Sequence, residues 1–177
     1  MSAISEAKEI AISKQDIASS GKKASRAEKE NEITKVLTFL IGGQAYGIEI
    51  PYIIEIIGVP KITRVPCIEI PDFIKGIINV RSKVVPVVNV RACFGKEEIE
   101  YDERACTIIV SHDNVSVGLI VDEVLDVLSV SEKHIADTPE LNHVNNNKFI
   151  NYILEMSDGV KLVLDVQKLI FDHDLAY

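Results

Sequence analysis

Isoleucine and valine dominate this chain, which has 26 isoleucines and 20 valines among its 177 residues. Both side chains branch at Cβ, so they lose rotamer freedom in helices and pack well on pleated sheets. Tryptophan is absent and only 6% of the residues are aromatic, which predicts an aliphatic core. The chain is therefore expected to be all-β, and 47% apolar residues suffice to bury a core.

From Ile33 onward, turn signals divide the chain into short apolar runs. Gly42-Gly43 and Asp158-Gly159 are typical of tight hairpins, and 81–83 and 112–114 are further turns. Pro86 lies inside an apolar run and cannot donate to a ladder, which indicates an edge or a bulge. The strands predicted in this way are 36–41, 46–50, 62–65, 76–80, 84–88, 106–110, 115–121, 124–130, 150–156 and 160–164.

Three short helical elements are expected between or after these strands. Pro51 suits the first turn of a helix over 51–55, because its missing N–H has no partner to lose there. A helical turn over 90–94 ends at Gly95, and Asp165 can cap a closing helix over 166–171.

The two halves of the folded region resemble each other. A shift of 71 residues places Phe39 on Val110 and Gly47 on Gly118, and a shift of 76 places Val88 on Leu164. The charged stretch 96–104 separates the halves. The repeat predicts two packed β-barrels, the first over about 33–95 and the second over about 104–171, with possible strand exchange between them.

Residues 1–32 differ in composition from the rest. They carry six basic and six acidic residues with scattered apolar ones, so they bury too little surface to offset chain entropy. This segment is predicted to be a flexible arm, disordered or loosely helical. Because the arm is neutral, the formal charge of −8 belongs to the remainder of the chain.

Charge and hydropathy narrow the possible partners. A net charge of −8 with few aromatics argues against nucleic acid, which requires clustered cations and stacking platforms. No apolar run approaches the roughly 20 residues of a membrane span, so no direct membrane insertion is expected. The N-terminus lacks the pattern of a signal peptide, and the expected location is the cytoplasm.

Residues that could support catalysis or bind a metal are present but not suitably spaced. The four histidines form no HxH or HExxH pair, and the three cysteines form no CxxC pair. No phosphate-binding loop and no nucleophile elbow occurs. The sequence thus predicts neither a catalytic site nor a cofactor, and the protein is not expected to be an enzyme. The four histidines are His112, His134, His143 and His173, and the three cysteines are Cys67, Cys93 and Cys106.

One stretch is more specific than composition. Residues 73–81 read FIKGIINVR and residues 84–91 read VVPVVNVR, and together they resemble the signature of the CheW family. The likeness extends over about residues 33–171 in the same order, including 46–50, 117–122 and the Leu164-Asp165 pair. The resemblance implies two interlocked five-stranded barrels of the SH3 or OB type.

The resemblance also implies a function and a site. Members of this family bridge the cytoplasmic tip of methyl-accepting chemotaxis receptors to the regulatory domain of the histidine kinase CheA. The first barrel would contact the kinase, and a groove between the barrels would take the receptor hairpin. The residues carried over as partner-binding are Glu55, Arg81, Ile53, Val84, Gly76 and Ser82.

This chain departs from the family pattern at three positions. Ser82 stands where the family usually has glycine, and a positive φ there would strain a residue that has a Cβ. Asn151 also replaces a usual glycine, and Asn89 replaces a usual aspartate while keeping an oxygen that can cap a helix. Arg81 itself has two readings, a contact with a partner or a local ion pair with Glu55.

Three other functions are alternatives to the adaptor. A CheW-like domain fused to a response-regulator receiver, as in CheV, would need about 120 further residues. A small-ligand barrel would need a sizeable apolar cavity with convergent polar groups. An OB-like oligonucleotide binder is opposed by the negative charge and the scarcity of aromatics.

Overall fold

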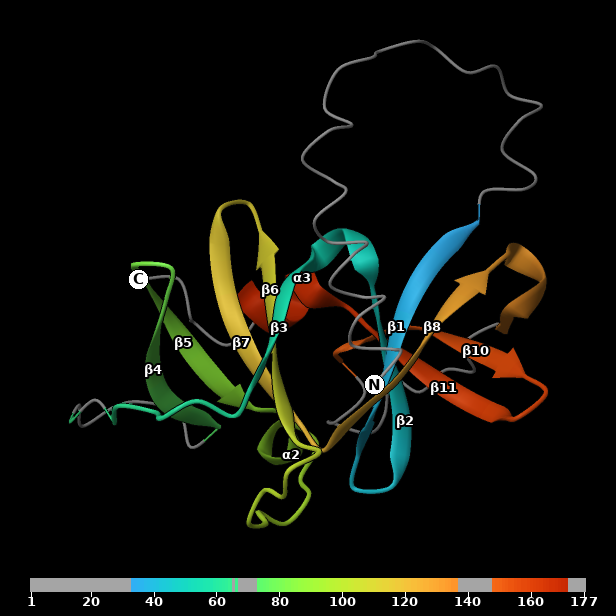
Figure 1. The fold of residues 1–177 in the computed structure, drawn as a ribbon. Coiled ribbons are helices and arrows are strands. Elements are labelled where there is room, and N and C mark those ends of the chain that lie inside the picture. Colours follow the sequence, from blue (N-terminus) through green and yellow to red (C-terminus); the bar gives the residue numbers. More distant parts are fainter. Residues whose placement is uncertain (1–32, 65, 67–72, 137–147, 172–177) are drawn as a thin grey trace, which may run out of the picture.

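The computed structural model describes residues 33–64, 66, 73–136 and 148–171. The predicted arm over 1–32, Val65, Cys67, His143 and His173 lie outside this part of the chain. Within the described residues, eleven strands form two sheets, drawn on the right and the left of Figure 1. The all-β prediction is confirmed.

The first sheet has the strand order β8-β1-β2-β11-β10-β9, and the second has the order β3-β6-β7-β5-β4. The second sheet has the expected five strands, whereas the first gains a sixth strand of two residues, β9. Strands of the first sheet are β1 (Thr34–Ile41), β2 (Gln44–Glu49), β8 (Glu123–Val130), β9 (Ile135–Ala136), β10 (Ile150–Met156) and β11 (Gly159–Leu164). Those of the second are β3 (Ile53–Gly58), β4 (Ile74–Val80), β5 (Lys83–Asn89), β6 (Cys106–His112) and β7 (Val115–Val121).

Each sheet combines strands from both halves of the sequence. The hairpin β1–β2 pairs with β8 and, in parallel, with β11. The hairpin β6–β7 pairs with β3 and, in parallel, with β5. The stretch 96–104 therefore divides the sequence repeat but does not divide the sheets, which exchange hairpins across it. The first and second barrels of the fold are accordingly those of the first and second sheets, not the sequence halves 33–95 and 104–171.

Strand register repeats along with the sequence. Phe39 of β1 lies opposite Val124 of β8, and Val110 of β6 lies opposite Ile53 of β3. Phe39 lies 71 residues before Val110, and Val124 lies 71 residues after Ile53. The second pair therefore repeats the first with the two halves of the sequence interchanged. A register irregularity follows at the same place in both ladders. The fold is thus built twice from the same plan.

The second sheet closes on itself. Thr63, after β3, forms an antiparallel bridge with Ile77 of β4, with two backbone hydrogen bonds of 2.9 Å. Because β3 and β4 lie at opposite ends of the strand order, this bridge joins the two edges into a barrel. The strand predicted over 62–65 is limited, among its described residues, to this bridge.

The core explains why the central strands are apolar on both faces. In β6, Ile108 belongs to the large cluster shared by both sheets, while Ile109 belongs to a small cluster inside the second barrel. In β1, Leu37 likewise belongs to the shared cluster, and Val36 belongs to a small cluster inside the first barrel. These strands are buried on both sides, so their residues are not alternately apolar and polar.

Short helices close each half. α2 (Val90–Cys93) is capped by the side chain of Asn89, and α3 (Val166–Phe171) begins after Asp165, whose carboxylate accepts from the Lys168 N–H at 3.0 Å. Both were predicted. The helix expected over 51–55 is wrong: a 3-10 turn, η3 (Ile50–Tyr52), replaces its start, and β3 begins at Ile53. The β-branched run that follows pairs with β6, and this pairing outweighs the helix signal of Pro51.

Pro86 lies where its missing N–H is tolerated. Although β5 is an inner strand, its pairing with β7 is limited to residues 87–89. Residues 83–86 pair with β4 alone, so Pro86 lies in a locally one-sided part of the ladder. The expected edge character of Pro86 is therefore local to this segment.

Candidate functional site

The turn between β4 and β5 places the predicted charged residue at an exposed tip. Arg81 and Ser82 both have positive φ values, 49° and 65°, which make this a tight hairpin turn. The Asn79 side chain accepts the Ser82 N–H at 3.0 Å and holds the turn. Serine therefore adopts at position 82 a conformation that favours glycine, which is the strained case that the sequence left open.

Arg81 forms a forked ion pair with Glu55 of β3. The distance from Nε to Oε1 is 3.2 Å, and that from Nη2 to Oε2 is also 3.2 Å. The Arg81 side chain is 75% exposed, while that of Glu55 is 18% exposed. The local ion pair is thus formed, and it leaves the outer face of the guanidinium accessible to another molecule.

Val84 follows the same turn and is also exposed. Its side chain is 67% exposed in the segment of β5 that pairs only with β4. A valine at this level of exposure gains little from the fold, so contact with another surface is one way to bury it. Ser82 and Lys83 are exposed beside it. Together, Glu55, Arg81, Ser82 and Val84 form what is called here the tip surface.

Two of the predicted site residues lie inside the fold. Ile53 is 5% exposed and belongs to the shared core, and Gly76 is buried in β4. A Cβ at Gly76 would lie 2.3 Å from the Thr63 carbonyl oxygen, and its φ is 144°. Gly76 thus allows the close backbone approach that seals the second barrel, and Ile53 packs beneath the tip surface rather than in it.

Ile54 is an exposed residue that the sequence did not single out. It is 43% exposed beside Glu55, whereas Ile53 and Ile56 on either side are buried. The register irregularity between Ile53 and Glu55 changes the regular alternation of the strand. No signal in the apolar run Ile53-Ile54 marks which residue faces outward.

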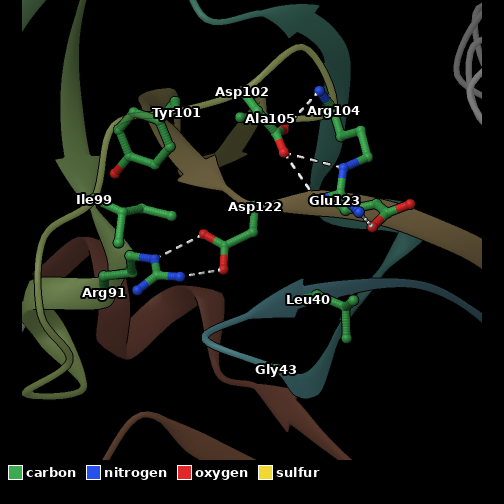
Figure 2. Close-up of a pocket in the computed structure, with 10 residues that line it drawn as sticks. All are labelled: Leu40, Gly43, Arg91, Ile99, Tyr101, Asp102, Arg104, Ala105, Asp122 and Glu123. Atoms are coloured by element: carbon green, nitrogen blue, oxygen red, sulfur yellow. Dashed lines mark hydrogen bonds and ion pairs between the residues drawn. The ribbon is translucent and has the colours of Figure 1, made fainter.

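A second group of charged residues lies between the sheets, around a cavity of about 270 Å³. Figure 2 shows Arg91 and Asp122 paired with each other among the residues that line this cavity, with Leu40 and Gly43 of the β1–β2 hairpin nearby. Arg91 donates from Nε to Oδ1 at 2.8 Å and from Nη2 to Oδ2 at 2.7 Å. The family resemblance did not single out this pair.

The charged forms of this pair are mutually stabilised. The hydrogen bonds to Asp122 raise the pKa of Arg91 despite partial burial. Burial raises the pKa of Asp122, but hydrogen bonds from Arg91 and the Gly42 N–H lower it by more, so its pKa lies below the ordinary value. Both side chains are mostly buried, at 11% and 18% exposed.

No described group is arranged for nucleophilic or metal chemistry. Desolvation raises the pKa of the Cys93 thiol to about 12 and that of Cys106 to about 11, which keeps both protonated at neutral pH. Within the described residues, no cluster of three His, Cys, Asp or Glu side chains could hold a metal ion. In the same part of the chain, none of the helices has the length and apolar character to cross a membrane.

The fold and these surfaces define a two-barrel β-protein with exposed charged and aliphatic residues at one hairpin turn. A family model described as the CheW-like domain matches residues 35–173. The chain is 31% identical over 140 residues to the chemotaxis protein CheW of Klebsiella aerogenes, covering 79% of this chain and 83% of that one. It is 33% identical over 140 residues to CheW of Thermotoga maritima, covering 77% and 87%.

A solved structure agrees with this assignment. The crystal structure of the scaffolding protein TtCheW from Thermoanaerobacter tengcongensis superimposes with a TM-score of 0.71 at 29% identity, covering 78% of this chain and 93% of that chain. The chain belongs to the CheW-like family. It is accordingly a chemotaxis protein of the adaptor or scaffold class.

Proposed function

We propose that this protein couples methyl-accepting chemotaxis receptors to the histidine kinase CheA and promotes kinase activation in the ternary complex. The observation that carries the proposal is membership in the CheW-like family over residues 35–173. In this account the chain is a non-enzymatic adaptor in the cytoplasm, and it is recruited to receptor arrays at the membrane.

The tip surface is the proposed contact with the regulatory domain of the kinase. It combines an exposed guanidinium with an exposed aliphatic side chain, Val84, and Arg is among the residues enriched at interface centres. Glu55 accepts one hydrogen bond from Arg81 Nη2 and forms an ion-pair contact with its Nε, so fewer Arg81 rotamers remain for the free protein to give up on binding. Ile53 and Gly76 support this contact indirectly. Ile53 anchors β3 in the shared core, and Gly76 allows β4 to approach the Thr63 backbone closely.

The cytoplasmic tip of the receptor is the second proposed partner. A helical hairpin presents ridges of side chains, and an aliphatic groove with a few charges receives such ridges well. The family resemblance puts this groove between the two sheets, which pack on one shared aliphatic core.

The test is a pull-down of the full chain with a receptor cytoplasmic fragment and with CheA, separately. Arg81→Glu reverses the charge at the exposed position of the tip surface. It should therefore weaken capture of the kinase at least about tenfold, which corresponds to about 1.4 kcal/mol of binding free energy. Lys83→Glu is the matched control, because it reverses a neighbouring exposed charge in the same hairpin. Lys83→Glu should reduce capture much less.

The outcomes separate the site from the function. If folded Arg81→Glu protein captures CheA as well as wild type does, the tip surface is not the kinase contact. If wild-type protein captures neither CheA nor the receptor fragment, the proposed adaptor function is itself wrong.

A further inference from the structure

The chain passes between the two sheets twice, and each passage has the same three parts. A crossover segment, a hairpin turn and a short helix meet at each place. At the first joint these are Asp122, the β1–β2 turn at Gly42 and α2, and at the second they are Tyr52 of η3, the end of β6 at His112 and α3. The two joints are related by the internal repeat.

The first joint is ionic and connects both sheets through one carboxylate. Asp122 accepts two hydrogen bonds from Arg91, which lies in α2 directly after β5 of the second sheet. Asp122 also accepts from the Gly42 N–H at 2.6 Å, and its own N–H donates to the Leu40 carbonyl at 3.0 Å. Gly42 and Leu40 belong to the hairpin of the first sheet, so Asp122 is held from both sides.

Arg91 is itself fixed by further contacts. Its Nη1 donates to the Glu97 carbonyl at 2.9 Å, and its backbone N–H donates to the Asn89 side chain at 3.1 Å. The Tyr101 hydroxyl donates to the same Asn89 oxygen at 3.1 Å. The guanidinium therefore has little freedom to follow Asp122 if the sheets rotate against each other.

The second joint has no ion pair at the corresponding positions. The repeat places Gln167 at the position of Arg91 and Pro51 at that of Asp122. The rings of Tyr52 and His112 lie 5.7 Å apart, and those of His112 and Phe171 lie 5.9 Å apart. The same architecture therefore forms without a carboxylate and a guanidinium, so the ion pair is not a requirement of this type of joint.

The chemistry of the two joints differs in directionality. Ring contacts tolerate a range of offsets and tilts, whereas a forked guanidinium–carboxylate pair has one planar geometry. A partly buried ion pair loses the hydration of both charges, and this loss offsets much of its attraction. Such a pair therefore adds little net stability to the fold, but it can fix one geometry. We infer that Arg91 and Asp122 are positioning residues that set the angle between the two sheets.

The angle between the sheets affects every binding surface to which both sheets contribute, whichever partner binds there. The test accordingly needs only the free protein. Residual dipolar couplings of backbone amides report the orientation of each sheet in a common frame, and they can be fitted separately for the first and the second sheet.

In wild type, the couplings of both sheets should fit one alignment tensor. In Asp122→Asn, each sheet should still fit well alone, but the two tensors should differ in orientation or magnitude. Arg91→Lys keeps the charge and loses the forked geometry, so it should produce the same separation of tensors. Arg104→Gln is the matched control, because Arg104 lines the same cavity, pairs with Asp102 and Glu123 and is 66% exposed; it should retain a single tensor.

The inference is overturned if both Asp122→Asn and Arg91→Lys retain one tensor with the wild-type angle. It is equally overturned if neither variant folds, because the pair would then be a requirement of the fold and not a positioning device. A loss of thermal stability with an unchanged angle would likewise assign the pair a purely structural role.

Discussion

The side chains of Arg81 and Glu55 connect the two edges of one sheet. Arg81 lies in the turn that follows β4, Glu55 lies in β3, and two contacts of 3.2 Å join them. Since β3 and β4 are the outermost strands of the second sheet, the pair spans the same seam of the barrel that the bridge between Thr63 and Ile77 closes. An exposed cation is thereby held against a rigid part of the fold.

The first prediction concerns Glu55→Gln. Because Arg81 is 75% exposed, loss of the ion pair should change the free energy of unfolding by less than about 1 kcal/mol. The affinity for the kinase domain should fall about threefold to tenfold, since Arg81 loses the group that orients it. Urea denaturation and titration calorimetry measure the two quantities. An unchanged affinity would show that orientation of Arg81 has no part in binding.

The second prediction concerns Gly76→Ala, which should lower the free energy of unfolding by at least about 2 kcal/mol. The added Cβ meets the Thr63 carbonyl, and the φ of 144° is unfavourable for any residue with a side chain. Gly58→Ala is the control, because nothing lies within 4 Å of its added Cβ, and it should stay within about 0.5 kcal/mol of wild type. Equal losses in the two variants would contradict the proposed seam.

The third prediction concerns Ser82→Gly, which should raise the free energy of unfolding by about 0.5–1 kcal/mol. Serine is strained at a φ of 65°, and glycine relieves that strain at some entropic cost. Ser129→Gly, at an exposed position within β8, should instead be destabilising, because glycine weakens a strand interior. Thermal unfolding of the two variants provides the comparison, and a destabilised Ser82→Gly protein would argue against strain in this turn.

Much of this fold could be predicted because each strand is a short β-branched run bounded by a turn, and because the halves repeat. Phe39 and Gly47 recur at Val110 and Gly118, and the structure places both pairs at equivalent positions of their hairpins. The exchange of hairpins was foreseen only as a possibility. Local periodicity is the same whether a hairpin pairs within its own half or with the other one.

The site could be predicted less completely, for two physical reasons. In the run Ile53-Ile54-Glu55, one irregularity in register decides which side chain faces outward, and neighbouring isoleucines carry no mark of it. Arg91 and Asp122 are 31 residues apart and meet only because β5 pairs in parallel with β7. A contact created by such pairing has no local sequence signal.

The fourth prediction concerns pH. Because the pKa of Asp122 is lowered in the folded protein, its contribution to stability is present above the unfolded pKa, about 3.9, and is lost as the pH falls through the folded pKa. Asp122→Asn should therefore be less stable than wild type by about 1–3 kcal/mol at pH 7, with the gap closing as the pH approaches 2.

Urea denaturation across this pH range measures the gap. Ile108→Val is the control, since it removes a methylene from the core, should cost about 0.5–1.5 kcal/mol and leaves the ion pair in place. Its deficit should be nearly constant with pH. A constant deficit in Asp122→Asn as well would contradict the assigned linkage.

Kinase activation by joining CheA to a receptor is the proposed function of this chain. It is measured most directly as CheA autophosphorylation in the presence of receptor-containing membranes, with increasing amounts of the purified full chain. We expect a rate that rises with the chain only when receptor and kinase are both present, and a much smaller rise with Arg81→Glu. A rate that wild-type protein leaves unchanged, under conditions in which it is folded, would show that the chain does not couple receptor and kinase.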